Sequence, residues 1–222
     1  METVKKKEFV EIKYTGFANG EMFDSNIEED LKKINSEAKV HKIIIAIGEK
    51  MVVPGLDDAL EGKEVGKEYS INVSAKEGFG ERMRELVKTI PLKVFTEKNI
   101  NPRPGLVLSM DDSFAKIIAV SGARVITDFN NPLAGKDLVY KFVIIRKVID
   151  DKEKISALFE FFFKFIPEFD VQEKITVRGP KVLEVYMKAF SGKFKDLIGK
   201  DVVFEEQKLE KQENKETQVK NT

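Results

Sequence analysis

Hydrophobic and polar residues alternate along several short segments in the first third of the chain. Residues 9–17 read FVEIKYTGF and residues 67–73 read KEYSINV, so every second side chain can face a core. Two shorter segments lie between them, residues 21–24 and the apolar run IIIAI at 43–47. We therefore expect four strands of one sheet in this region.

Helical spacing replaces this alternation in two places. The segment LDDALEG at residues 56–62 has its apolar side chains on one helical face and ends in a glycine, as many helices do. Residues 25–42 are rich in Glu, Lys, Asn and Ser, with Leu31 and Ile34 at helical spacing. This pattern predicts a short amphipathic helix at 56–62 and an excursion from the sheet edge that contains another.

The pattern changes again after residue 84. Residues 85–130 contain an Ile-Pro step, the breaker NPRPG and three short strand-like segments, LVLSM, FAKIIAV and ARVITDF, which predict a compact all-strand unit. Residues 138–149, LVYKFVIIRKVI, then resemble the long central strand of the first sheet. A unit that starts inside one sheet and ends before its last strand is an insertion, and its two ends must lie close together.

The last third of the chain predicts a small module with two helices. Residues 155–166, ISALFEFFFKFI, and 180–190, PKVLEVYMKAF, read as helices, while 171–177 and 201–209 read as strands. A module of about 60 residues has a marginal core, and its first helix carries more aromatic surface than such a core can readily bury. We expect this surface to pack against a second copy of the chain, through Phe159, Phe161, Phe162, Phe163 and Phe165.

Composition excludes several kinds of chemistry. The chain of 222 residues has 38 basic and 38 acidic side chains, so it lacks the basic surplus that nucleic-acid binding normally requires. It contains no cysteine, and His41 is its one histidine. Thiolate catalysis, zinc–cysteine sites and a Ser-His-Asp triad are therefore not expected, and neither is a metal or another cofactor.

The N-terminal sequence gives an expectation for location. METVKKKEFVEIKY moves from basic residues directly into strand-like alternation, without the apolar stretch of a secretory signal. The longest apolar runs are too short to cross a bilayer. We therefore expect a cytoplasmic protein that does not bind membranes.

Four ordered motifs carry a resemblance to a known family. They are YTGFANGEMFDSN from residue 14, IGEKMVVPGLDDALEGKEVGKEYSINV from 47, GFGER from 78 and NPLAGKDLVYKFVI from 131. Over residues 7–150 the chain resembles the FKBP family of peptidyl-prolyl cis/trans isomerases, and the position of the insertion is similar to that in SlyD-like and long archaeal members. The resemblance implies an α+β fold, with an FKBP-type antiparallel half-barrel sheet around a short helix, an inserted small all-β flap domain and a C-terminal α/β module.

The domain prediction follows from this comparison. Residues 1–84 and 131–150 would form the isomerase domain, and residues 85–130 the inserted flap, which in this family is implicated in binding unfolded chains. Residues 151–210 would form the C-terminal α+β module, expected to dimerise. The polar residues 211–222 are predicted to be a disordered tail.

The resemblance also implies a pocket without a nucleophile. By position it would be lined by Tyr14, Phe23, Asp24, Ile43, Val52, Val53, Leu56, Phe79 and Tyr140. Leu56 stands where the family often has a tryptophan under the proline ring, and Phe79 stands where many members have a tyrosine. Tight binding of the macrolide inhibitors is therefore not implied.

The chemistry of amide rotation suits such a pocket. The barrier is about 18–20 kcal/mol because twisting the bond destroys its resonance. A twisted amide has lost the charge-separated resonance form, so an apolar, water-excluding cup favours it over the planar ground state. On this view Asp24 orients the Tyr14 hydroxyl or polarises the surroundings of the substrate carbonyl, and it transfers no proton.

The apolar residues of the insertion have two interpretations. They either fill the core of that unit or remain exposed as an adaptable patch for unfolded polypeptides. The candidates for client contact are Val87, Ile90, Leu92, Val94, Phe95 and Phe114, with Pro91 among the apolar neighbours.

Three functional hypotheses follow. The first is an isomerase for unfolded or proline-containing polypeptides that also holds them through its flap. The second is a chaperone or adaptor with a vestigial pocket, and the third is a dimeric scaffold organised by the C-terminal module.

Overall fold

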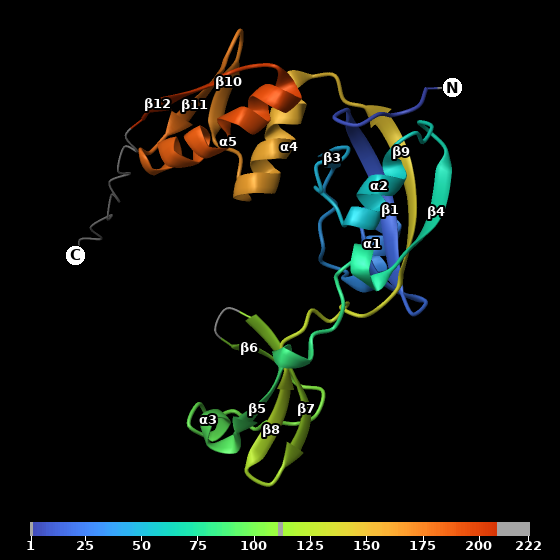
Figure 1. The fold of residues 1–222 in the computed structure, drawn as a ribbon, viewed down its shortest axis with the longest axis vertical. Helices are drawn as coiled ribbons and strands as arrows, with labels where there is room; N and C mark the ends of the chain where they lie inside the picture. Colours follow the sequence, from blue (N-terminus) through green and yellow to red (C-terminus); the bar gives the residue numbers. More distant parts are fainter. Residues whose placement is uncertain (1, 111–112, 208–222) are drawn as a thin grey trace, which may run out of the picture.

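The computed structural model describes residues 2–110 and 113–207, whose strands form three separate sheets (Figure 1). The first sheet lies in the middle of the molecule, the second extends from one of its ends, and the third packs with two helices beside the other end. The predicted tail at 211–222 and the last residues of the predicted C-terminal module lie outside the described residues.

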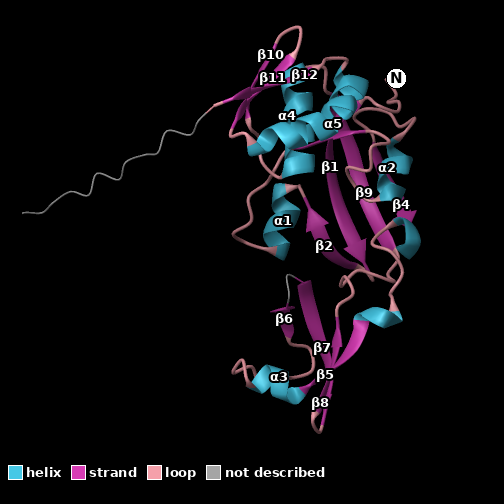
Figure 2. Ribbon diagram, turned by 60° about the vertical axis from the view of Figure 1, so that its left-hand side comes forward, coloured by secondary structure: helices cyan, strands magenta, loops and turns pink. Residues whose placement is uncertain are grey.

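The first sheet is antiparallel and curled (Figure 2). Its strands are β2 (Glu21–Ser25), β1 (Phe9–Ala18), β9 (Leu138–Lys147) and β4 (Glu68–Val73) in spatial order, and β3 (Ile43–Ala46) pairs with β1. The prediction of an α+β protein with an antiparallel half-barrel sheet is confirmed. All four early strands that alternation predicted are present, and β9 pairs with both β1 and β4.

Helix α2 (Pro54–Leu60) packs against this sheet and closes its core. Pro54 occupies the start of the helix, where a missing N–H costs no helical hydrogen bond. Leu56 and Leu60 are almost fully buried against the inward side chains of β1, including Ile12. Helix α1 (Glu28–Ile34) has no buried residue and lies in the predicted excursion after β2.

The second sheet has the strand order β5-β8-β7-β6 and is antiparallel throughout. Its strands are β5 (Val87–Pro91), β8 (Arg124–Asp128), β7 (Ser113–Ser121) and β6 (Val107–Met110). Helix α3 (Leu92–Thr96) follows β5 directly, so this unit is not all-strand as predicted. The spacing of three residues between Leu92 and Phe95 lets both reach the small core in one helical turn.

The third sheet carries two helices and follows β9. Its strands are β10 (Glu168–Val171), β11 (Ile175–Gly179) and β12 (Val202–Glu206), and the helices are α4 (Asp151–Phe163) and α5 (Val182–Ile198).

The prediction of a single strand at residues 171–177 is wrong. The amide of Gln172 donates to the carbonyl of Lys174, so residues 172–174 form the turn between β10 and β11. The run of three polar side chains at this point suits a turn exposed to solvent better than the middle of a strand.

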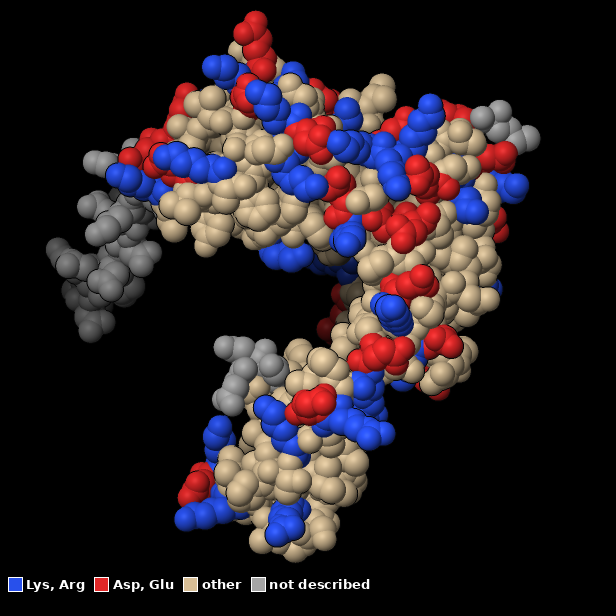
Figure 3. Space-filling model, viewed as in Figure 1, with Lys and Arg blue, Asp and Glu red and all other residues tan. Residues whose placement is uncertain are grey.

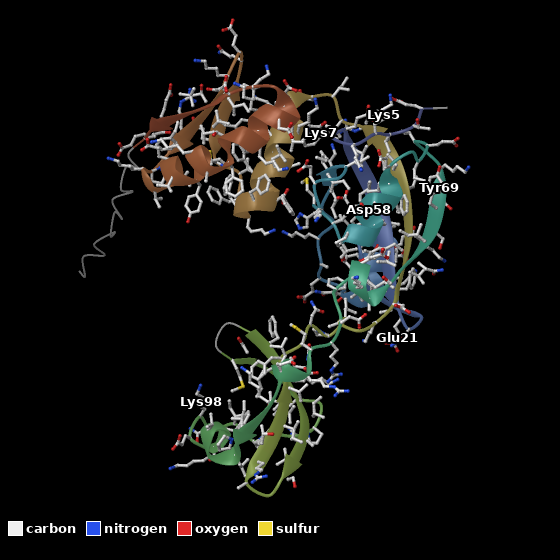
Figure 4. The ribbon with its side chains drawn as sticks, in the orientation of Figure 1. Lys5, Lys7, Glu21, Asp58, Tyr69 and Lys98 are labelled. Carbon is white, nitrogen blue, oxygen red and sulfur yellow. The ribbon has the colours of Figure 1, made fainter. Side chains whose placement is uncertain are left out.

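The third sheet and its helices dock on the first sheet within one chain. Phe159 and Ile155 of α4 are fully buried in a cluster that also contains Phe9 of β1 and Ala46 of β3. Lys7 lies where α5 meets the first sheet (Figure 4), and its Nζ is 2.6 Å from the Asp196 carboxylate. Part of the aromatic surface expected to need a second copy is therefore covered by the chain itself.

Candidate active site

Eight of the nine residues predicted to line a pocket belong to the core cluster of the first sheet. Leu56 and Tyr140 belong to the buried cluster between α2 and the sheet, and six others pack against it half-buried: Tyr14, Phe23, Ile43, Val52, Val53 and Phe79. Asp24 joins them through a hydrogen bond to Tyr14. Segments separated by more than a hundred residues thus meet at one place.

Four aromatic rings brace one another in this cluster. The Tyr140 ring lies edge to face with both Tyr14 and Phe23, with ring centroids 5.9 Å apart in each pair. Phe23 meets Phe79 in the same geometry, also at 5.9 Å. Such contacts are favourable beyond the area they bury, so each ring limits the movement of its neighbour.

Gly16 allows these rings to approach β1. A Cβ atom built on Gly16 would lie 2.7 Å from Cζ of Phe23 and 3.0 Å from Cε1 of Tyr140. Real Cβ atoms essentially never come so close to another atom, so any side chain here would displace a ring. This glycine is needed for space, and sequence reasoning did not single it out.

Leu56 lies deeper than the resemblance implied. Its side chain is 1% exposed and Tyr140 is 3% exposed, so both are covered by the other side chains of the site. The accessible walls are the half-buried side chains, among them Phe23, Val53 and Phe79. A proline ring that enters this surface would meet those side chains first.

The Tyr14 hydroxyl donates to Oδ2 of Asp24 at 2.7 Å. Burial, followed by this hydrogen bond and the Asp24 charge, raises the pKa of Tyr14 well above its usual range. Burial, with a smaller effect of the Asp24 charge, raises the pKa of Tyr140 to about 12. Both tyrosine side chains are therefore protonated near pH 7. The Tyr14 hydroxyl acts as an oriented hydrogen-bond donor, and neither tyrosine acts as a base.

Asn26 fixes the backbone that carries Tyr14. Its Oδ1 accepts from the Tyr14 amide at 2.7 Å, and its Nδ2 donates to the carbonyl of Ile12 at 2.8 Å. Asn26 is 6% exposed, so these bonds replace contacts with water. The sequence shows that Asn26 belongs to the first motif, but it does not show that Asn26 bonds to the backbone of β1.

Asp57 plays a similar part for the loop before α2. Its two carboxylate oxygens accept from the amides of Gly48 at 2.9 Å and Lys50 at 2.7 Å, and the side chain is 2% exposed. This clamp fixes the turn that leads to Val52 and Val53. In the sequence, Asp57 reads only as an acidic residue in the first turn of a helix.

Comparisons with known proteins bear on this site. A family model described as FKBP-type peptidyl-prolyl cis-trans isomerase matches residues 1–96. A short-type peptidyl-prolyl cis-trans isomerase of Methanocaldococcus jannaschii is 32% identical over 144 residues, which cover 64% of this chain and 90% of that protein. The chain belongs to the FKBP-type peptidyl-prolyl cis-trans isomerase family. The resemblance inferred from the four motifs is confirmed.

Two further matches involve the insertion and longer relatives. A model described as FKBP26, IF domain, matches residues 88–133 of this FKBP-type chain. The SlyD isomerase of Yersinia pestis is 31% identical over 110 residues, covering 47% of this chain and 56% of that protein. The SlyD isomerase of Treponema pallidum is 30% identical over 110 residues, covering 47% and 62%. The chain thus matches a little over half the length of these SlyD proteins.

The six candidate client-contact residues of this FKBP-type chain do not share one surface. Phe114 is 73% exposed and Val87 is 36% exposed, whereas Phe95 is 1% exposed and forms the core of the second sheet. The remaining three, Ile90, Leu92 and Val94, pack partly buried against that core. The structure therefore corrects the interpretation of Phe95, because a side chain enclosed by its own unit cannot contact a client.

Two exposed residues escaped sequence reasoning. Val107 is 53% exposed and Ile118 is 42% exposed, and both line a hollow of about 310 Å³ together with Phe114. Val107 pairs with Lys116 of β7, on the same face as Phe114, and Ile118 continues the alternation of exposed positions 114, 116 and 118 along this strand. We call Val87, Val107, Phe114 and Ile118 the flap face.

Residues 128–130, at the end of the second sheet, bond to the chain segment that leads into it. The Met83 amide donates to Oδ1 of Asn130 at 2.8 Å, and Nδ2 of Asn130 donates to the Met83 carbonyl at 2.9 Å. The Asp128 carboxylate accepts from Arg82 and from the Asn130 amide. These contacts, together with the Gly135 amide donating to the Gly80 carbonyl, keep the two connecting segments side by side.

The described residues contain no cluster of three or more His, Cys, Asp or Glu side chains suited to a metal ion. Within residues 2–110 and 113–207, no helix combines the length and apolar character needed to cross a membrane.

Proposed function

We propose that this isomerase accelerates rotation about X-Pro bonds in unfolded and folding polypeptides, and that the nine residues around Tyr140 form its active site. The observation that carries the proposal is the aromatic cluster itself, in which four rings and four aliphatic side chains pack together and Asp24 holds the hydroxyl of Tyr14. Such walls exclude water and stabilise the twisted amide, which has less charge separation than the planar one.

Few contacts are needed for a useful rate. Each tenfold acceleration requires about 1.4 kcal/mol of differential stabilisation. Phe23, Val53 and Phe79 supply apolar contacts to the ring, and the Tyr14 hydroxyl, held by Asp24, is oriented beside the carbonyl that turns. No step moves a proton.

We further propose that the flap face holds unfolded polypeptide near this site. Its exposed apolar side chains are the kind of surface that marks protein interaction. Figure 3 shows an open hollow between the flap and the other two parts of the molecule, and on this proposal a polypeptide bound on the flap extends across it to the pocket. A tethered client then meets the pocket at a raised effective concentration. On this proposal residues 1–84 and 131–150 form the isomerase domain, 85–130 the flap and 151–210 a third module.

Proline-limited refolding of an unrelated protein tests both parts. The whole chain should accelerate the slow phase, Tyr14→Ala should lose most of that acceleration, and replacement of residues 85–130 by a short glycine linker should lose it for the protein while sparing a short proline peptide. Equal losses on both substrates in the linker variant would contradict the division of labour. Acceleration unaffected by Tyr14→Ala would favour a chaperone with a vestigial pocket.

We also propose that the third module pairs two chains. Helix α5 exposes Val182 by 63%, Val185 by 71% and Tyr186 by 49%, in one contiguous turn of helix. Light scattering should give about twice the 25.3 kDa chain mass, and Val185→Glu should return the mass to that of one chain. Lys98→Glu, at an exposed position in the flap (Figure 4), is the control that introduces a glutamate away from α5. A wild-type chain that scatters as a monomer contradicts this pairing.

A further inference from the structure

A groove of about 590 Å³ runs between β3 and α4, outside the proposed active site. One wall is formed by five consecutive residues, 41–45, with Met51, and the opposite wall by residues of α4 from Lys152 to Phe161, with Lys164 beyond its end. Ile43, Ile44 and Ile45 are consecutive residues of β3, and side chains of a strand alternate between its faces, so all three line one groove only where the edge of the strand is open to it. The edge of β3 therefore faces the groove.

This edge carries backbone groups without a strand partner. Strand β3 pairs only with β1 among the described residues. The Ile47 amide donates to the carbonyl of Glu8, just before β1, at 3.0 Å. Backbone amides alternate in direction along a strand, so those of Ile43 and Ile45 also point toward β1. The amides of Ile44 and Ala46 point away from it.

The outward groups have little to bond with. The Ala46 amide meets the sulfur of Met51 at 3.2 Å, a weak acceptor, and the Ala46 carbonyl accepts from the Glu49 amide at 3.3 Å. No backbone partner of the Ile44 amide or carbonyl on this side occurs within the described part of the chain, so Ile44 offers one unused donor and one unused acceptor. An open strand edge of this kind is suited to adding one more strand.

The opposite wall sets the chemistry of the occupant. Ser156, Ala157 and Phe161 present small and apolar surface from α4, whereas Lys152, Glu160 and Lys164 place charges of both signs along it. Because neither sign dominates, the groove has no field that selects an ion or a nucleic acid. Apolar walls beside free backbone groups suit an extended peptide with uncharged side chains.

The groove is continuous with the proposed proline site. Ile43 and Met51 line the groove and also pack against the buried cluster around Tyr140. Helix α4 stands beside β3 at the inner side of the molecule, facing the hollow between the three sheets (Figures 1 and 3). A polypeptide whose proline occupies the pocket thus reaches this groove with its neighbouring residues.

We propose that the groove between β3 and α4 binds an extended segment of the polypeptide substrate next to its proline, as a strand added to the edge of β3. The inference rests on the proposed proline site, and it makes α4 one wall of the substrate path. The polar residues 208–222 of this chain, KLEKQENKETQVKNT, have none of the apolar alternation that such a strand requires.

Fluorescence anisotropy with proline peptides tests this directly. The probes are a four-residue proline peptide and two longer ones, with four alternating Val and Thr residues added either before or after it. We expect one extension to tighten binding by about fivefold to tenfold, since a few added backbone hydrogen bonds suffice for that. N-methylation of alternate amides in the extension should remove the gain although the side chains remain.

Ser156→Trp fills the groove from α4, and Ser70→Trp, on an exposed position of β4, is the matched control. The ratio of short-peptide to long-peptide dissociation constants should fall to about one in Ser156→Trp and stay at the wild-type value in Ser70→Trp. Because each variant is compared with itself, partial misfolding does not alter this ratio.

Three results would overturn the inference. They are no gain from either extension, a gain that survives N-methylation, and a gain that survives Ser156→Trp. A change of oligomeric mass in Ser156→Trp would assign the groove to a contact between two copies instead, and tighter binding of the long peptide after removal of residues 208–222 would assign it to the tail. Catalysis on the same short peptide is measured separately, so failure of the isomerase proposal shows itself independently of these binding ratios.

Discussion

The proposed proline site and the flap face expose apolar side chains in opposite ways. In the site, Phe23 and Phe79 are half-buried and held edge to face with their neighbours. On the flap face, Phe114 is 73% exposed, and its strand neighbour across the ladder is Ser109. One region fixes its aromatic rings, and the other leaves them free to adapt.

This difference matches two different tasks. Stabilising one twisted amide requires walls at fixed positions, because misplacement by about 1 Å can cost a hundredfold in rate. Holding many unfolded sequences requires a surface whose side chains can rearrange around each of them. The hydrogen bonds of Asn26 and Asp57 fix the backbone of the first region, whereas those of Asn130 fix the connecting segment at Met83 and not the strand that carries Phe114.

Substitution of Gly16 should have the largest effect, and it should change one region without changing the other. Gly16→Ala places a Cβ atom 2.7 Å from Phe23 and should displace that ring, lowering kcat/KM for a short proline peptide by about tenfold to a hundredfold. Suppression of aggregation of an unfolded protein, which depends on the flap face, should change by less than twofold. Protease-coupled isomerisation and light scattering measure the two quantities.

Gly192→Ala is the matched control for this experiment. Gly192 lies in α5, and a Cβ atom added there would meet no neighbouring side chain within 4 Å, so this change should leave both assays at wild-type values. Unchanged catalysis in Gly16→Ala would show that the position of the Phe23 ring does not limit the rate.

The sequence pattern predicted the packing of the first sheet better than that of the second. The order and spacing of the four motifs brought eight of the nine residues predicted to line a pocket into one cluster, because strand alternation and helix spacing determine which side chains face inward. The burial of Leu56 was not predictable in this way, since it depends on how closely the rings of β2 and β9 cover α2.

In the flap, local pattern was insufficient. Phe95 and Phe114 are equivalent in the sequence, yet α3 turns Phe95 into the core while β7 leaves Phe114 outside. Alternation along β7 leaves Phe114, Lys116 and Ile118 on one face, but it does not reveal that the small core around Phe95 covers the other face. Docking of α4 on Phe9 depends on contacts between distant segments, which no single segment reveals.

The smallest expected effect comes from a substitution on the flap face, which should weaken client holding and leave isomerisation unchanged. Phe114→Ser removes its most exposed aromatic ring and should weaken protection of an unfolded protein against aggregation by roughly threefold to fivefold, since single contacts in an adaptable surface carry only part of its affinity. Val120→Ser is the control, because Val120 pairs with the core residue Val125 and lies off the flap face. Equal losses in the two variants would mean that general destabilisation of the second sheet, rather than the flap face, limits holding. A loss confined to Phe114→Ser, with short-peptide isomerisation changed by less than twofold, would establish that fixed and adaptable aromatic surfaces act separately in one chain.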